Sequence, residues 1–234
     1  MNKKRLFLIL VPFIVIGIIL GYSYTMGIPV DTSDPSLEFP IIESDRIERF
    51  SAYHTPDWGE PGVFHNGIDL VISDNVTVVS PVDGTIVSYV ENINSYGGNV
   101  LFDIGIAVNW AWEVHLVLEP GFMDAENNSL QSSNIALSIG QRVSPGDELG
   151  TLLYSENYPH LHYMLLNFGS DVCTYNYSTS GAQTIFEDIA ADSNSTILFP
   201  YPAPNLIMSP VVVAIVGGSA IYLFIVLIVF KFRK

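Results

Sequence analysis

The middle of the chain, residues 46–192, consists of short apolar runs separated by turn-forming pairs that contain glycine. The runs are four to twelve residues long and rich in Val, Ile, Leu and aromatic side chains, which is typical of strands. The expected strands cover residues 76–79, 85–90, 99–104, 107–118 and 161–166. One weak amphipathic pattern, at residues 182–191, predicts a helix. The pattern therefore predicts a mainly β domain with an antiparallel β-sandwich or barrel-like sheet.

Both ends of the chain carry a long apolar run next to basic residues. Residues 207–230 contain no charged residue, and 24 residues at about 1.5 Å rise cross a hydrocarbon core of roughly 30 Å. The basic tail that follows, residues 231–234, is expected in the cytoplasm by the positive-inside rule. Residues 1–26 combine a basic start with a shorter apolar run, which fits either a signal peptide or an uncleaved signal anchor.

Two segments between the apolar runs and the domain have the composition of linkers. Residues 27–45 hold several prolines and acidic residues and predict a spacer, and residues 193–206, with alternating prolines, predict an extended stalk. We therefore expect a single- or double-pass protein of the cell membrane, held in the lipid bilayer by flanking transmembrane helices. Its domain would face outside, and its basic ends would be cytoplasmic. The single Cys173 agrees with that location. So do four glycosylation sequons, which begin at Asn75, Asn127, Asn176 and Asn194.

The formal charge narrows the classes of partner. The chain has 24 Asp and Glu against nine Lys and Arg, which gives a net charge of −15. So few basic residues exclude a nucleic-acid-binding protein, because phosphates would not be neutralised. The single Cys excludes an intrachain disulfide and a thiolate zinc cluster. An acidic domain of this kind suits a neutral or basic peptide.

The histidines carry the candidate chemistry. His65 and Asp69 stand four residues apart, and His160 and His162 stand two apart, which on a strand places both rings on one face. Three N and O ligands with an open fourth position are typical of a catalytic zinc site, whereas a structural site adds a fourth ligand, more often Cys. Each spacing also arises by chance in a chain of this composition, so the surrounding motifs decide.

Five segments between residues 60 and 168 match a set of motifs in the same order. They read G-V-F-H-N-G-I-D at 62–69, N-V-T-V-V-S-P-V-D-G-T-I at 75–86, E-V-H-L at 113–116, G-Q-R-V-S-P-G-D-E-L-G at 140–150 and P-H-L-H at 159–162. In these segments the chain resembles the LytM/lysostaphin-type zinc metalloendopeptidases, whose targets are peptide cross-links of bacterial cell walls. The resemblance implies the fold named the duplicated hybrid motif.

The resemblance also implies a role for each motif residue. His65, Asp69 and His162 are expected to bind one Zn²⁺ per chain, and His115 and His160 are expected to be catalytic histidines that do not bind the metal. The metal would acidify its bound water, while the two histidines would assist deprotonation and stabilise the oxyanion. We therefore expect a membrane-anchored, extracytoplasmic zinc metalloendopeptidase that hydrolyses cell-wall peptide cross-links or surface polypeptides.

Strand parity sets the expected faces of residues 107–118. His115 shares a face with Glu113, whereas Trp110 and Trp112 point to the other side. The two tryptophans are therefore predicted to lie in the core rather than in a substrate groove.

Departures from the family pattern keep other functions open. Met164 stands where the family often has Glu, the loop before residues 159–162 reads T-L-L-Y-S-E-N-Y where the family usually has Gly and small polar residues, and an acidic insertion rich in Asn and Ser covers residues 121–134. One alternative is a wall-binding or regulatory module that keeps the fold but does not cleave. Another is a membrane-anchored structural protein of the cell surface, in which the histidine cluster is incidental. A chain that binds no zinc would favour either alternative.

Overall fold

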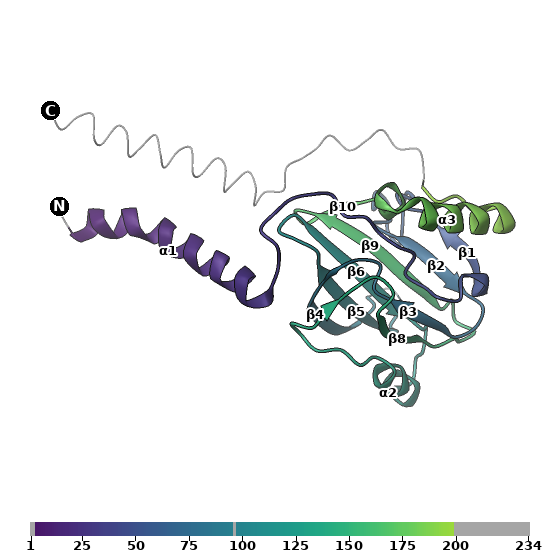
Figure 1. Cartoon of the computed structure of the whole chain (residues 1–234). Coiled ribbons are helices and arrows are strands. Elements are labelled where there is room, and N and C mark those ends of the chain that lie inside the picture. Colours follow the sequence, from purple (N-terminus) through teal and green to yellow (C-terminus); the bar gives the residue numbers. More distant parts are fainter. Residues whose placement is uncertain (1–2, 96, 199–234) are drawn as a thin grey trace.

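The computed structural model describes residues 3–95 and 97–198, and most of its elements are strands (Figure 1). The strands are β1 (Ile47–Ser51), β2 (Ile68–Ile72), β3 (Val76–Val79), β4 (Gly84–Ile93), β5 (Val100–Ala107), β6 (Trp112–Glu119), β7 (Arg142–Val143), β8 (Glu148–Leu152), β9 (His160–Asn167) and β10 (Ser170–Val172). The helices are α1 (Lys3–Met26), α2 (Ala125–Ser133) and α3 (Ser180–Ser193), with short 3-10 helices at Ser44–Arg46 and Thr174–Tyr177.

One large antiparallel sheet holds most of these strands. Its order is β1-β2-β9-β6-β5-β4-β7, with β10 paired to β9, while β3 and β8 form a separate two-stranded antiparallel sheet. Strand β9 comes late in the chain but lies between β2 and β6. It therefore brings His160 and His162 next to β2, which begins shortly after His65. The predicted mainly β, antiparallel domain is confirmed, with one large sheet and one small one.

The large sheet has a buried face and an open face. Leu70 of β2, Tyr163 of β9 and Leu116 of β6 are fully buried in the hydrophobic core. The residues that alternate with them point to the other face. On that open face, Asp69 of β2 and Val117 of β6 both pair with His162 of β9, so the three form one row across neighbouring strands.

Part of the predicted spacer belongs to the folded domain. Leu37, Phe39 and Ile41 are 0%, 7% and 4% exposed. Phe39 packs edge-on against Phe186 of α3, with ring centroids 4.9 Å apart, and Leu37 forms backbone hydrogen bonds with residues 177 and 179. The spacer predicted over residues 27–45 is therefore corrected at residues 37–41, because alternate apolar side chains of this segment complete the core.

The predicted strand over residues 107–118 instead holds the end of β5, a turn and most of β6. β5 ends at Ala107 and β6 begins at Trp112. The Asn109 side chain holds the turn by accepting hydrogen bonds from the backbone N–H groups of Ala111 and Trp112, at 2.9 and 3.2 Å. Trp112 packs in the core as predicted, at 3% exposed, but Trp110 lies in the turn and is 40% exposed. The predicted core position is therefore wrong for Trp110.

The ends of the chain bear on the predicted membrane segments. Helix α1 extends away from the large sheet (Figure 1). Within residues 3–95 and 97–198, no helix combines the length and the apolar character needed to cross a bilayer. The predicted C-terminal span over residues 207–230, the basic tail and residues 199–206 of the stalk lie outside the described residues. The start of the stalk, residues 195–198, runs beside residues 50–53.

Candidate metal centre

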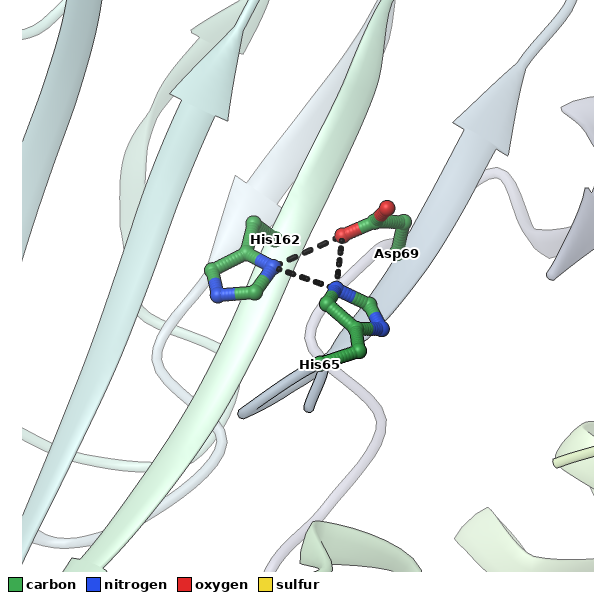
Figure 2. A group of neighbouring side chains, drawn as sticks. All are labelled: His65, Asp69 and His162. Carbon is green, nitrogen blue, oxygen red and sulfur yellow. Dashed lines mark hydrogen bonds and ion pairs between the residues drawn. The ribbon is translucent and has the colours of Figure 1, made fainter. Parts of the chain in front are cut away.

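Three of the residues assigned to a metal meet on the open face of the large sheet (Figure 2). His65 lies in the loop before β2, Asp69 lies on β2, and His162 lies on β9, where it pairs directly with Asp69. His65 Nε2 is 3.0 Å from Asp69 Oδ1 and 3.2 Å from His162 Nδ1. His162 Nδ1 is 2.7 Å from Asp69 Oδ1. The structure therefore brings the three expected ligands to one point.

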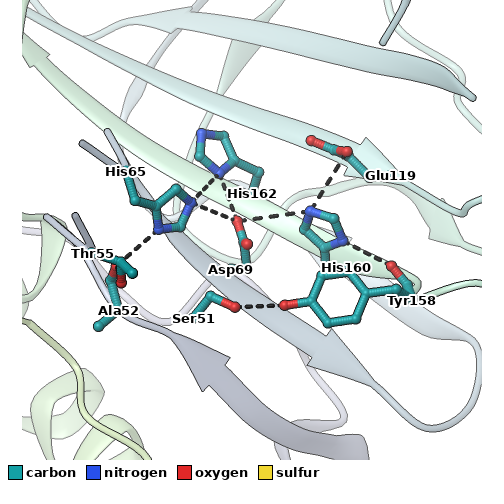
Figure 3. Close-up of polar contacts among 9 residues, drawn as sticks. All are labelled: Ser51, Ala52, Thr55, His65, Asp69, Glu119, Tyr158, His160 and His162. Atoms are coloured by element: carbon teal, nitrogen blue, oxygen red, sulfur yellow. Dashed lines mark hydrogen bonds and ion pairs between the residues drawn. The ribbon is translucent and has the colours of Figure 1, made fainter. Parts of the chain in front are cut away.

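The His65 ring is fixed by its surroundings. Its Nδ1 donates a hydrogen bond to the carbonyl oxygen of Ala52 at 2.8 Å (Figure 3), so Nε2, which faces the other two side chains, is the nitrogen available to a metal. The backbone N–H of His65 donates to the carbonyl of Thr55 at 3.0 Å, and Trp58 stacks on the ring with centroids 4.1 Å apart. A carbonyl partner on the second nitrogen is typical of metal-binding histidines.

The donor set fits a zinc ion. Two imidazole nitrogens and one carboxylate oxygen lie within 4.8 Å of one another. Burial acts to raise the pKa of the Asp69 carboxyl, but hydrogen bonds with His162 and His65 outweigh it and hold that pKa below its ordinary value. The second oxygen, Oδ2, is buried without a hydrogen-bond partner. A buried carboxylate with one unpaired oxygen beside two imidazole nitrogens suits a cation, and this mixture of N and O donors suits Zn²⁺.

Gly67 allows β9 to approach the loop that carries His65. A Cβ atom at Gly67 would lie 2.7 Å from Cε1 of His162 and 2.9 Å from the carbonyl oxygen of Tyr163. A larger residue would therefore displace the ring or the strand backbone. The glycine of the H-x-G-x-D motif is thus required by the packing of the centre itself.

His160 lies beside the three ligand residues (Figure 3). Its Nδ1 donates to the carbonyl oxygen of Tyr158 at 2.9 Å, and its Nε2 is 3.7 Å from Asp69 Oδ1 and 3.6 Å from Glu119 Oε2. Burial acts to lower the pKa of His160, but the Glu119 carboxylate and the charge of Asp69 outweigh it and raise that pKa to about 9. Near neutral pH, Nε2 of His160 therefore carries a proton that it can donate toward the centre.

His115 is not brought to the centre. The residue of β6 that pairs with His162 is Val117, so His115 lies about 7 Å further along the strand. Asp103 and Glu113 hold its two ring nitrogens at 2.8 and 3.1 Å. Burial acts to lower the pKa of His115, but these carboxylates outweigh it and raise that pKa to about 9. The pairing of β6 with β9 thus separates His115 from the other four predicted site residues.

A cavity of about 640 Å³ opens over this part of the sheet. Its lining includes His160 and His162 from the centre, Trp58 beside them, and the carboxylates of Asp103 and Glu119. Asparagine side chains also line it, and among the described residues its lining contains neither Lys nor Arg. A cavity of this size suits a ligand rather than a single water molecule.

Glu119 is the site residue that sequence reasoning misses. It pairs with His160 across β6 and β9, and its side chain is 13% exposed. The available signal is parity, because His115, Val117 and Glu119 are alternate residues on one strand and share a face. Parity alone does not show which of these three residues pairs with His160. That is decided by the register of β6 against β9.

No family model matches the chain, and no curated protein matches it. Among solved structures, a zinc-containing peptidase from Vibrio cholerae is 16% identical, with a TM-score of 0.43 over 59% of this chain and 39% of that one. A putative M23 peptidase from Pseudomonas aeruginosa is 17% identical, with a TM-score of 0.41 over 64% and 53%. Csd3 from Helicobacter pylori is 17% identical, with a TM-score of 0.42 over 68% and 41%. The chain therefore spans 39% to 53% of the length of these proteins.

Proposed function

We propose that the chain is a membrane-anchored, extracytoplasmic zinc metalloendopeptidase with the duplicated hybrid motif fold. The observation that supports this proposal best is the convergence of His65, Asp69 and His162 within 4.8 Å. His162 also lines the large cavity, with His160 beside it. Three protein ligands leave a metal an open position for water or substrate, as a catalytic rather than a structural zinc site requires.

The residues of the centre would have different roles in hydrolysis. A bound zinc ion would polarise the scissile carbonyl and acidify a water molecule. His65, oriented by the carbonyl of Ala52, and Asp69, kept ionised by its hydrogen bonds, hold the metal together with His162. His160 carries a proton on Nε2 and donates a hydrogen bond to the carbonyl oxygen as negative charge develops there.

The charge of the cavity limits the substrate. Asp103 and Glu119 are acidic, no Lys or Arg of the described residues lines the cavity, and the chain as a whole has a net charge of −15. Acidic polymers are repelled by such a field, whereas neutral or basic peptides are not. We therefore propose a cell-wall peptide cross-link or a surface polypeptide as the substrate.

The zinc content of the purified protein tests this proposal. We expect about one zinc per chain in the wild type and loss of the metal in His162→Ala, because two remaining ligands hold zinc far more weakly than three. His115→Ala is the matched control, since it makes the same change on the same face outside the centre and is expected to keep zinc. Circular dichroism of both variants checks that they fold. A wild-type protein without zinc, or equal zinc in the two variants, would contradict the proposal.

Hydrolysis assays separate the peptidase from the non-cleaving module. The separation of His115 from the centre favours the second candidate function, because the family pattern assigns that residue a catalytic role. Purified bacterial cell walls and unfolded casein are suitable substrates. Cleavage of either one by the zinc-loaded wild type, and not by His162→Ala, supports the peptidase. Zinc-dependent binding to cell walls without cleavage of either substrate supports the module.

A further inference from the structure

The pairing of β6 with β9 places Glu119, not His115, beside His160. Glu119 pairs with His160, and Val117 pairs with His162. His115 lies two residues beyond Val117 on β6, and thus four residues from Glu119, the residue that pairs with His160. The Oε2 atom of Glu119 is 3.6 Å from Nε2 of His160, and Figure 3 shows the two side chains directed toward each other. A carboxylate therefore occupies the position next to the catalytic histidine.

His115 is unsuited to accept a proton. Its Nδ1 is 2.8 Å from Asp103 Oδ1, and its Nε2 is 3.1 Å from Glu113 Oε1. Since an ionised carboxylate only accepts hydrogen bonds, both ring nitrogens carry protons in this arrangement. The resulting imidazolium joins two carboxylates and has no free lone pair. Its role in the fold is to neutralise Asp103 and Glu113 on the open face.

Glu119 has the properties of a proton acceptor. Its side chain lines the same cavity as His160 and His162 and is 13% exposed. Among the described residues its one ion-pair partner is His160, which contacts Oε2. The other carboxylate in the lining, Asp103, is already hydrogen-bonded to His115. Glu119 is thus the carboxylate of the cavity whose second oxygen is left for a water molecule.

We infer that Glu119 is the second catalytic group of this site and acts as the base beside His160. The inference rests on the proposed peptidase function. The Glu119 carboxylate takes a proton from the attacking water as the new carbon–oxygen bond forms, and His160 lies beside it on the neighbouring strand. The proton then passes to the departing nitrogen as the carbon–nitrogen bond breaks. One water molecule is consumed, a carboxyl group and an amine are formed, and Glu119 returns to its ionised state.

The test compares the zinc-loaded full chain as wild type, Glu119→Gln and His115→Gln. Glutamine keeps the shape of Glu119 and removes the proton acceptor, so we expect kcat to fall by about 100-fold or more with little change in KM. His115→Gln is expected to cleave the same substrate, cell walls or casein, within about threefold of the wild-type rate. All three proteins are expected to hold one zinc per chain, because neither position is a ligand.

Binding of acetohydroxamate, a small zinc-directed inhibitor, provides a readout that needs no substrate. Its N–H and O–H groups can donate to a neighbouring carboxylate, so Glu119→Gln is expected to bind it about tenfold more weakly, while His115→Gln binds it as the wild type does. Unchanged binding and cleavage in Glu119→Gln would overturn the inference and leave the peptidase function standing. A wild type without zinc would overturn both.

A conservative variant separates catalysis from folding. Glu119→Asp keeps a proton acceptor on a shorter side chain and is expected to recover about tenfold of the rate lost in Glu119→Gln, which leaves its kcat about tenfold below that of the wild type. If Glu119→Gln fails to fold, the comparison of Glu119→Asp with the wild type still decides. A near-wild-type KM with a reduced kcat supports the inference, and an unchanged kcat contradicts it.

Discussion

The ion cluster around His115 makes the stability of the domain depend on pH. Burial acts to lower the pKa of His115, but the hydrogen bonds that His115 donates to Asp103 and Glu113 outweigh it and raise that pKa to about 9, whereas an unfolded histidine has a pKa of about 6.5. A pKa raised in the folded state adds stability that is fully present below about pH 6.5 and is lost as the pH rises through about 9. We expect the wild type to lose about 1–3 kcal/mol more than His115→Gln between pH 6.5 and pH 10. Urea unfolding at several pH values measures this difference, and parallel curves would contradict it.

The cluster of His65, Asp69 and His162 is predictable from the sequence, but the neighbour of His160 on β6 is not. His65 and Asp69 stand four residues apart around Gly67, and His162 ends the P-H-L-H segment, so short motifs mark all three residues in the sequence. The partner of His160 is specified by the pairing of β6 with β9, which brings together residues 41 positions apart in the chain. The E-V-H-L motif draws attention to His115, and only the strand pairing shows that Glu119 occupies the place beside His160.

At the scale of elements, strands are predictable where an apolar run ends at a turn that contains glycine or proline. The strand expected at residues 76–79 is β3, and the helix expected at residues 182–191 lies within α3. Helix α2 escapes prediction because its sequence is polar all round and buries only Gln131. That side chain donates to the carbonyl of Thr151 and accepts from the N–H of Leu153, so the helix is held by β8 rather than by an apolar face. Contacts of this kind leave no hydrophobic period in the sequence.

The segment over residues 37–41 is expected to contribute to stability as a part of the core. Leu37 is 0% exposed, so Leu37→Ala is expected to lower the free energy of unfolding by about 2–5 kcal/mol through lost burial and a residual cavity. Val30→Ala is the control from the same predicted spacer, because Val30 is 58% exposed and its truncation should change stability by less than about 0.5 kcal/mol. Urea unfolding of the two variants provides the comparison. Equal stabilities would show that residues 37–41 do not belong to the cooperative unit.

At the scale of the whole molecule, charge is segregated along the chain. Every Asp and Glu lies between Asp31 and Asp192, and both ends are basic. Anionic lipid headgroups attract the basic ends and repel the acidic domain, which would hold the cavity away from the bilayer and open to a substrate in the cell envelope. The apolar runs and the acidic domain therefore support the same proposal, in which the centre faces outward and the ends anchor it.

Membrane fractionation tests this proposed arrangement. We expect the full chain to sediment with membranes and to resist extraction by high salt and alkaline carbonate, because an apolar span is held by burial rather than by charge. Release by salt alone would contradict anchoring.

A chain that ends at residue 206 distinguishes the two interpretations of residues 1–26. Its release as a soluble protein indicates a cleaved signal peptide, and its retention in the membrane indicates a signal anchor. In either case a protease added to intact cells should cleave the domain of the full chain, since the proposal places residues 46–192 outside the cytoplasm.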